Sequence, residues 1–228
     1  MYRCVIIHLD SAVERMPLME KLRKTLIHTV EVYSAKDGTE WEKTSKIAKK
    51  HPREQEPVSR GILGCAHSHI DVIHGTLKAK HQYCLIFEDD CEVLATQDSI
   101  YGFIHYAKDL PAEWDMILLG ASEYVESEKV NERYTKVQRF WGTHAVILKE
   151  KAMRAVLQTF ADAQKEGIFL PADWMYNEAI KKHGLTCYGP TQIDQLCQQK
   201  PGLVSAITGK PRIAPKPATK YVTMTPPK

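Results

Sequence analysis

Apolar positions along the chain follow two periods, one typical of strands and the other typical of helices. Strands are predicted at the short, mostly apolar runs 2–9, 29–35, 82–88, 114–120, 137–149 and 185–190. Helices are predicted where apolar residues recur every three or four positions, over 12–26, 61–80, 97–108, 150–166 and 173–184. Because the two kinds of element alternate, the pattern predicts an α/β layered fold in which helices flank a mostly parallel central sheet.

Two segments fall outside this pattern. Residues 39–60 are polar and contain Pro52 and Pro57, so we interpret them as a surface excursion or lid. Residues 209–228 are rich in lysine and proline and have no apolar period, which predicts an extended or disordered tail. The expected organisation is therefore one domain over residues 1–208, followed by this tail.

The apolar run at 82–88 leads into three consecutive acids, Glu88, Asp89 and Asp90. Three adjacent carboxylates repel one another, and each is costly to desolvate without a partner. A solvated strand end without a function is the simpler interpretation. A divalent-cation site is the alternative that we favour, because clustered carboxylate oxygens suit Mg²⁺ or Mn²⁺ and because α/β sheets bind ligands beyond the carboxyl ends of their strands.

A cation at a strand end suits the chemistry of a sugar nucleotide. Breaking the glycosidic bond develops negative charge on the departing diphosphate, which a bound metal ion can stabilise. The chain contains no G-x-x-x-x-G-K-[ST], G-x-G-x-x-G or G-x-S-x-G sequence, which argues against a P-loop enzyme, a dinucleotide oxidoreductase and an α/β-hydrolase.

Composition narrows the possible partners and location. The 228 residues are 43% hydrophobic and carry a formal net charge of only +3, so we expect a sizeable core and no nucleic-acid partner. No stretch approaches the ~18 apolar residues of a membrane span, and the N-terminus has no cleavage-site signature. The six cysteines include no C-x-x-C pair, which favours reduced thiols. We therefore expect a soluble, cytoplasmic protein.

Five segments carry a family resemblance by their order and their intervals. They are "VIIHLDSAVERM" (5–16), "YSAKDG" (33–38), "LGCAHSH" (63–69), "LIFEDDCEV" (85–93) and "WGTHAVILKEKAM" (141–153). Together they resemble glycosyltransferase family 25, the group of lipooligosaccharide and collagen hydroxylysine galactosyltransferases. The resemblance covers roughly residues 4–205.

The resemblance implies a GT-A-type, Rossmann-like fold and a UDP-sugar donor that carries a hexose, either galactose or glucose. It also implies an Mn²⁺ or Mg²⁺ ion and transfer with inversion to a hydroxyl group. That hydroxyl could belong to a glycan, a lipid-linked sugar or a hydroxylysine side chain.

Residue by residue, the resemblance implies a donor site and a metal site. Residues expected at the nucleotide, the ribose or the diphosphate are Asp10, Arg15, Ala35, Asp37, Gly38, Gly64, Ser68, His69 and Asp89. The acids expected at the metal are Glu88 and Asp90, of which Asp90 is the expected direct ligand. Two positions depart from the family pattern: His8 stands where asparagine is usual, and Ala66-His67 replaces the usual residues between Cys65 and Ser68.

Three further candidates come from the residues themselves. Asp173 follows a proline-containing loop at a predicted helix start and is our candidate for the general base, although a helix N-cap is a competing interpretation. Glu123 and Glu126, expected in the loop after Gly120, are its rivals. His144 either completes the metal shell or faces a strand core.

Two other functions stay open at this point. His67, Asp71 and His74 fall on one face of a predicted helix, which would suit a metal-dependent hydrolase. A sugar-nucleotide or glycan-binding module without turnover is the other alternative. Trp174 and Tyr176 could stack on an acceptor sugar or belong to the core.

Overall fold

A computed structural model describes residues 2–26, 29–39, 60–94, 114–131, 134–190 and 196–203. The helix predicted at 97–108, residues 40–59 of the excursion predicted at 39–60, and the tail at 209–228 lie outside these residues. None of the helices within the described ranges is long and apolar enough to cross a membrane.

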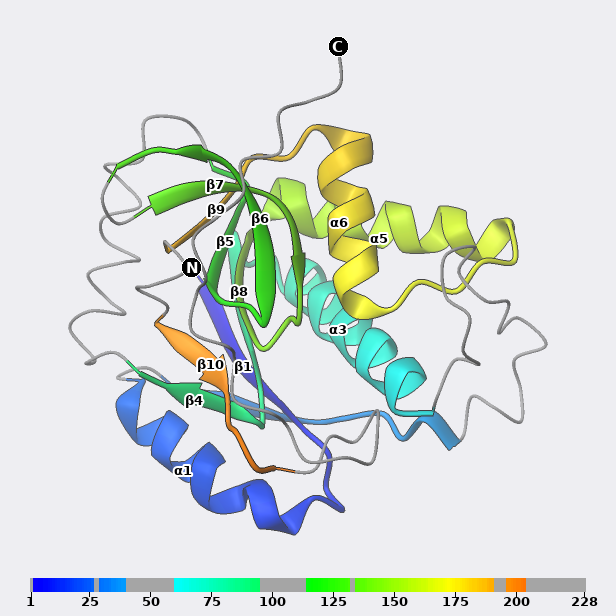
Figure 1. The fold of residues 1–228 in the computed structure, drawn as a ribbon. Helices are drawn as coiled ribbons and strands as arrows, with labels where there is room; N and C mark the ends of the chain where they lie inside the picture. Colours follow the sequence, from blue (N-terminus) through cyan, green and yellow to red (C-terminus); the bar gives the residue numbers. More distant parts are fainter. Residues whose placement is uncertain are drawn as a thin grey trace.

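An eight-stranded sheet with the order β2-β1-β3-β8-β5-β9-β7-β6 forms the centre of the fold (Figure 1). Its strands are β1 (Tyr2–His8), β2 (Glu31–Ser34), β3 (Tyr83–Glu88), β5 (Met116–Gly120), β6 (Glu123–Lys129), β7 (Tyr134–Trp141), β8 (Ala145–Lys149) and β9 (Cys187–Pro190). A separate antiparallel pair consists of β4 (Cys91–Val93) and β10 (Cys197–Gln199). The helical elements are η1 (Val13–Arg15), α1 (Met16–Thr25), α3 (Arg60–Lys78), α5 (Glu150–Lys165) and α6 (Ala172–His183).

The predicted α/β class is confirmed, but the sheet is mixed rather than mostly parallel. β1 runs parallel to β2 and β3, and β5 runs parallel to β9. β8 lies antiparallel between β3 and β5, and β6 and β7 form an antiparallel hairpin whose inner strand pairs antiparallel with β9. Alternation of strands and helices does not determine the direction of a strand that enters the sheet directly from a neighbouring hairpin.

The single strand predicted at 137–149 is two strands in the structure. Gly142 has a φ of +80°, a left-handed conformation that glycine adopts without steric cost, and it separates β7 from β8. Glu123 and Glu126 are also placed differently from the prediction, because they lie in the edge strand β6 rather than in a loop.

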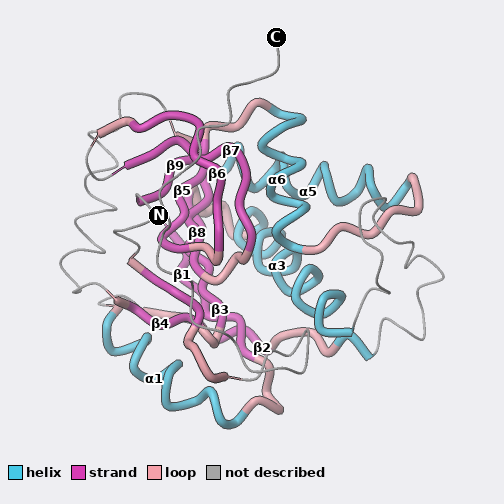
Figure 2. Tube along the Cα trace, in the orientation of Figure 1, coloured by secondary structure: helices cyan, strands magenta, loops and turns pink. Residues whose placement is uncertain are grey.

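Apolar residues cover both faces of the sheet. On one face, α3, α5 and α6 pack over a core that includes Val5, Ile86 and Val146. On the other face, α1 packs over Ile6 and Phe87 beside the small β4–β10 pair. Figure 2 shows this division, with the three long helices on one side of the strands and α1 on the other.

Strand direction brings several chain segments to one edge of the sheet. β1, β2 and β3 are parallel and end close together, since His8 pairs with Ser34 and Ile7 pairs with Glu88. The antiparallel β8 begins at that same edge, where the Glu88 amide donates to the His144 carbonyl at 3.0 Å. The residues that follow β1, β2 and β3 and those that precede β8 therefore lie together at this edge.

Two glycines let the loop after β2 pack against α3. A Cβ added at Gly38 would lie 1.7 Å from the Arg60 carbonyl oxygen, and one at Gly64 would lie 2.2 Å from the Lys36 carbonyl oxygen. The Ser68 hydroxyl also accepts a hydrogen bond from the Lys36 amide at 2.9 Å. Close backbone approach is therefore the role that the structure gives Gly38 and Gly64.

Gly64→Ala should lower the free energy of unfolding by about 1–3 kcal/mol, because the new methyl group meets backbone and the helix and loop must move apart. Gly75→Ala in the same helix is the matched control. Its Cβ would lie 2.9 Å from Nη1 of Arg3, the far end of a flexible side chain. Its steric cost is offset by up to about 1 kcal/mol of helix propensity. Chemical denaturation measures the free energy of unfolding of both variants. An equal loss of stability in the two would contradict the packing role of Gly64.

Candidate functional site

A cavity of about 180 Å³ lies at this edge of the sheet. It is bounded by the segments that follow β1, β2 and β3 and by the start of α3. Its lining residues are Ile7, Leu9, Arg15, Ala35, Lys36, Asp37, Gly38, Arg60, Gly61, Cys65, Glu88, Asp89 and Asp90. Three basic residues therefore line the same cavity as the three consecutive acids. The ammonium of one of them, Lys36, also pairs with the Asp71 carboxylate at 3.5 Å.

Most of the residues expected at the donor or the metal line this cavity. The structure brings together Arg15, Ala35, Asp37, Gly38, Glu88, Asp89 and Asp90. Asp10, Gly64, Ser68, His69 and His144 are not among the lining residues. Lys36 and Arg60, which the sequence interpretation passed over, do line it; Lys36 lies inside the "YSAKDG" segment, so its position was available as a signal.

Asp89 is tied to the end of β1. Its carboxylate accepts hydrogen bonds from Nη1 of Arg15 at 2.5 Å, from Nδ1 of His8 at 2.9 Å and from the Leu9 amide at 3.2 Å. Arg15 is 6% exposed and Asp89 is 4% exposed. Burial opposes the charge on Arg15, yet the Asp89 carboxylate outweighs it and raises the pKa of the guanidinium. Asp89 thus holds η1 against the end of β3.

Glu88 faces α3 and the start of β8. Its Oε1 accepts hydrogen bonds from the Thr143 hydroxyl at 2.6 Å and from Nε2 of His69 at 3.3 Å, and Sγ of Cys65 lies 3.9 Å away. Burial raises the pKa of Glu88, but the bonds from His69 and Thr143 and the charge of nearby His144 prevail and lower it to about 2. Glu88 is therefore an anion that its protein neighbours already stabilise.

Asp90 faces the cavity and the β4–β10 pair. It is 1% exposed, its Oδ2 lies 3.5 Å from the Gln199 amide nitrogen, and its backbone carbonyl accepts from the Lys200 amide at 2.8 Å. The side chain is therefore a deeply buried carboxylate at a cavity wall.

The donor-site candidates outside the cavity have structural surroundings. Ser68 is fully buried and donates to the Gly64 carbonyl at 2.7 Å. His69 is also fully buried, with Nδ1 2.9 Å from the Tyr176 hydroxyl. Asp10 is exposed and accepts from the Ser34 hydroxyl at 2.5 Å. These contacts support the walls of the site rather than its interior.

Asp173 lies in the first turn of α6, two positions after the N-cap Pro171. It is not the N-cap, and its Oδ1 accepts from the Trp174 amide at 2.9 Å. Burial and the Glu88 charge raise the pKa of Asp173, against the lowering effect of the Trp174 and Gly142 amides. Burial therefore outweighs the amides at the start of α6 in setting the direction of the Asp173 pKa.

The remaining candidates differ in exposure. Glu123 is exposed on the edge strand, and Glu126 is half-buried there. His144 is fully buried beside Glu88 and Gly120, since a Cβ on Gly120 would lie 2.9 Å from its Nε2. Tyr176 is fully buried in the core, and Trp174 packs partly buried against it.

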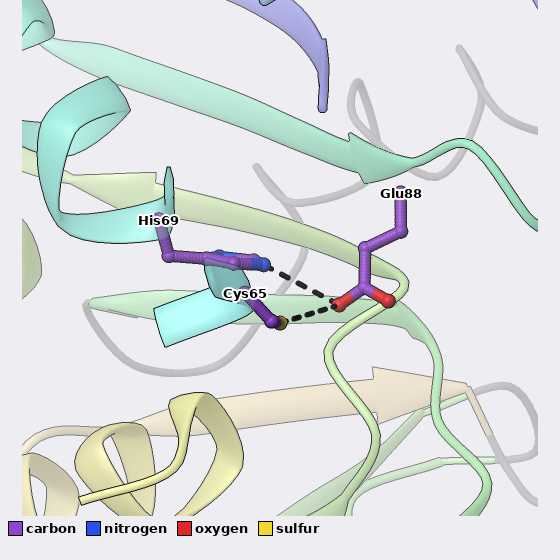
Figure 3. Close-up of side chains that lie close together, drawn as sticks. All are labelled: Cys65, His69 and Glu88. Carbon is purple, nitrogen blue, oxygen red and sulfur yellow. Dashed lines mark hydrogen bonds and ion pairs between the residues drawn. The ribbon is translucent and has the colours of Figure 1, made fainter. Parts of the chain in front are cut away.

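One cluster of mixed ligand atoms occurs in the described part of the chain, and it is not the one expected on α3. Cys65, His69 and Glu88 each offer an atom within 4.8 Å of the others (Figure 3). His67 instead packs edge-on against the Phe160 ring, 5.4 Å between centroids, and Asp71 accepts from the Tyr33 hydroxyl at 2.9 Å. The His67, Asp71 and His74 arrangement suggested for a hydrolase is thus not formed.

Comparison with known proteins identifies the family. Residues 1–176 match Glycosyltransferase family 25 (LPS biosynthesis protein). Among curated protein sequences, none matches the chain.

Several solved structures resemble the fold at low sequence identity. A glycosyltransferase involved in glycosylation of the major capsid of PBCV-1 is 11% identical, with a TM-score of 0.40 over 80% of this chain and 76% of that one. A UDP-glucose pyrophosphorylase complexed with UDP-glucose is 8% identical, with a TM-score of 0.47 over 87% and 93%. Mouse xyloside xylosyltransferase 1 is 9% identical, with a TM-score of 0.42 over 82% of this chain and 84% of that one. Since these TM-scores are below 0.5, the family assignment rests on the sequence match.

Asp89→Asn should destabilise the metal-free protein by about 3–5 kcal/mol, because it leaves the Arg15 charge buried without its partner. Asp90→Asn is the matched control at the next position. It removes an equal charge beside two other acids, and the relief of repulsion should keep its free energy of unfolding within about 1 kcal/mol of the parent. Urea denaturation compares the two, and a small effect of Asp89→Asn would show that the pair is not a structural constraint.

Proposed function

The chain belongs to glycosyltransferase family 25, and we propose that it transfers a hexose, galactose or glucose, from a UDP-sugar to a hydroxyl acceptor with inversion. The observation that carries this proposal is the cavity in which Asp90 faces the same space as Arg15, Lys36 and Arg60. A nucleoside diphosphate with a divalent cation needs both kinds of group, cations for its phosphates and a carboxylate for its metal. The acceptor class proposed is a glycan, a lipid-linked sugar or a hydroxylysine-type hydroxyl.

The residues at this cavity fit an Mn²⁺ or Mg²⁺ ion. Such ions take oxygen ligands, and they are commonly held by one or two carboxylates while phosphate oxygens and water complete the shell. Asp90, buried at the cavity wall, is the proposed ligand. When bound, the cation stabilises the negative charge that develops on the departing diphosphate. Glu88 lines the same cavity and accepts hydrogen bonds from Thr143 and His69, and His144 is buried beside it.

Basic side chains of the protein would act on the same negative charge of the departing diphosphate. Lys36 and Arg60 line the cavity and are the cations that we propose for the phosphate oxygens. Arg15 lines it as well and pairs with Asp89. Ala35, Asp37 and Gly38 also line the cavity, and we propose that the uracil and ribose bind beside them. The close packing of this loop on α3 supports a pocket that is formed before the donor binds.

Asp173 is the proposed general base. Inversion by direct displacement requires the acceptor hydroxyl to attack opposite the leaving diphosphate and to lose its proton to a nearby group. The Asp173 carboxylate is near enough to Glu88 for their charges to interact, but it does not line the donor cavity. We therefore propose that Asp173 lies on the side of the site where the acceptor binds. Its raised pKa makes the carboxylate a stronger base, which suits a proton acceptor that works near neutral pH.

Mn²⁺ and UDP together should raise the melting temperature more than either alone. At about 100 times the dissociation constant, ligand linkage contributes about 2.7 kcal/mol, which corresponds to roughly 5–11 °C for a domain of this size. GDP and ADP should give smaller shifts, and Asp90→Asn should remove the part that depends on Mn²⁺. Differential scanning fluorimetry measures these shifts; equal shifts with all three nucleotides would rule out a uridine-specific pocket.

Asp173→Asn should lower hexose transfer by about 10²–10⁴-fold, while UDP and Mn²⁺ bind almost as before. The acid limb of kcat/KM in the parent protein should lie above the ordinary aspartate pKa of about 3.9, because burial raises the pKa of this group. Donor turnover with Mn²⁺ and calorimetric UDP binding are the two measurements.

Glu123→Gln is the comparison variant, since Glu123 is the exposed rival on β6. If Glu123→Gln loses transfer and Asp173→Asn retains it, the base is Glu123. Loss of UDP binding in Asp173→Asn would instead make Asp173 a donor ligand or a structural residue. Normal UDP and Mn²⁺ binding without turnover of any hexose donor would favour a binding module over an enzyme.

A further inference from the structure

Three chemically different donor atoms converge beside the cavity. They are Sγ of Cys65, Nε2 of His69 and Oε1 of Glu88, all within 4.8 Å of one another (Figure 3). We propose that this cluster binds a Zn²⁺-class cation, at a position distinct from the oxygen-ligand site proposed at Asp90. The proposal does not depend on sugar transfer.

The spacing of the atoms suits such an ion. Zn²⁺ binds nitrogen and oxygen at about 2.0–2.2 Å and sulfur at about 2.3 Å, so tetrahedral ligand atoms lie roughly 3.3–3.8 Å apart. In the structure, Nε2 of His69 lies 3.3 Å and Sγ of Cys65 lies 3.9 Å from Oε1 of Glu88. Small side-chain adjustments would therefore complete the coordination without moving the backbone.

The local fold explains why the three atoms meet. Cys65 and His69 are four residues apart in α3, so they lie on one face of the helix. Glu88 ends β3, the strand on which α3 packs. Figure 3 shows the two helix side chains pointing at the carboxylate from the same side.

Two further contacts orient the ligands in the way that zinc sites require. The Tyr176 hydroxyl lies 2.9 Å from Nδ1 of His69, which directs Nε2 at the cluster. The Thr143 hydroxyl donates to Glu88 at 2.6 Å. Hydrogen bonds of this kind behind a metal ligand fix its orientation and support metal affinity.

Charge and softness select the class of ion. A Cys65 thiolate and the Glu88 carboxylate together offset the two positive charges of Zn²⁺, and His69 contributes a neutral ring. Binding releases the Cys65 thiol proton to solvent. Mg²⁺ and Mn²⁺ prefer all-oxygen surroundings, whereas sulfur with imidazole favours Zn²⁺ or Co²⁺. Because Cys65 and Glu88 also line the cavity, a fourth coordination position would face it and accept water or a phosphate oxygen.

Titration of the reduced, metal-free protein with Co²⁺ tests the proposal without any nucleotide. We expect a near-ultraviolet thiolate-to-cobalt absorption that saturates at one ion per chain. Zn²⁺ should displace the Co²⁺ at close to equimolar concentration, because it binds such ligands more tightly, and excess Mg²⁺ should not. Since UDP and Mn²⁺ are absent, failure here would leave the donor-site experiments unaffected.

Three variants make the test specific. Cys65→Ser should abolish the absorption, whereas Cys4→Ala should keep it, because burial raises the pKa of the Cys4 thiol to about 12 and it lies in the core. Tyr176→Phe keeps the ring and should weaken Co²⁺ binding by about 10–100-fold. Circular dichroism establishes that each variant is folded. The proposal is overturned if no thiolate absorption appears, if it persists in Cys65→Ser, or if Mg²⁺ displaces Co²⁺ as readily as Zn²⁺ does.

Discussion

The buried ion pair between Arg15 and Asp89 is the interaction on which the cavity end of the sheet depends. Both side chains are almost fully removed from water, so either charge alone would carry a large desolvation cost. The pair joins η1 to the end of β3, and the bonds from His8 and Leu9 to the same carboxylate bind the end of β1 to it. The Asp89 carboxylate thereby fixes the path of the chain after β1. Because this segment lines the cavity, the same carboxylate also fixes part of the cavity wall. His8 supplies one of these bonds, so its buried ring has a partner at this edge of the sheet.

Three consecutive acids are tolerated at this edge because each one faces a different set of partners. Glu88 turns to α3 and β8, Asp89 turns to β1 and η1, and Asp90 turns to the cavity. Hydrogen bonds and positive neighbours offset the repulsion and the desolvation of the first two acids, as the pKa of about 2 at Glu88 indicates. The interpretation of this segment as an ordinary solvated strand end is therefore wrong, since Asp89 and Asp90 are buried.

Local patterns predicted the elements well and their spatial relations less well. Apolar periodicity identifies β3 and α5 almost to the residue, because each buries a continuous run or one face. The direction of β8 depends on which strands it joins, and no local pattern carries that information. β6 was missed because an exposed edge strand with the sequence "EYVESEK" has little apolar alternation. The contact of His69 with Tyr176 spans 107 residues, so it too is a tertiary property.

Helix α6 connects the two sides of the site. Asp173 and Tyr176 are three residues apart, and thus lie on neighbouring positions of one helical face. Tyr176 contacts His69, and His69 contacts Glu88, so a chain of buried polar contacts holds α6 to the strand edge. The position of the Asp173 carboxylate is consequently set by the same contacts that orient Glu88. A general base placed in this way would be held at a constant distance from the leaving diphosphate and would not touch the donor. A rigid helix, rather than a flexible loop, would set that distance.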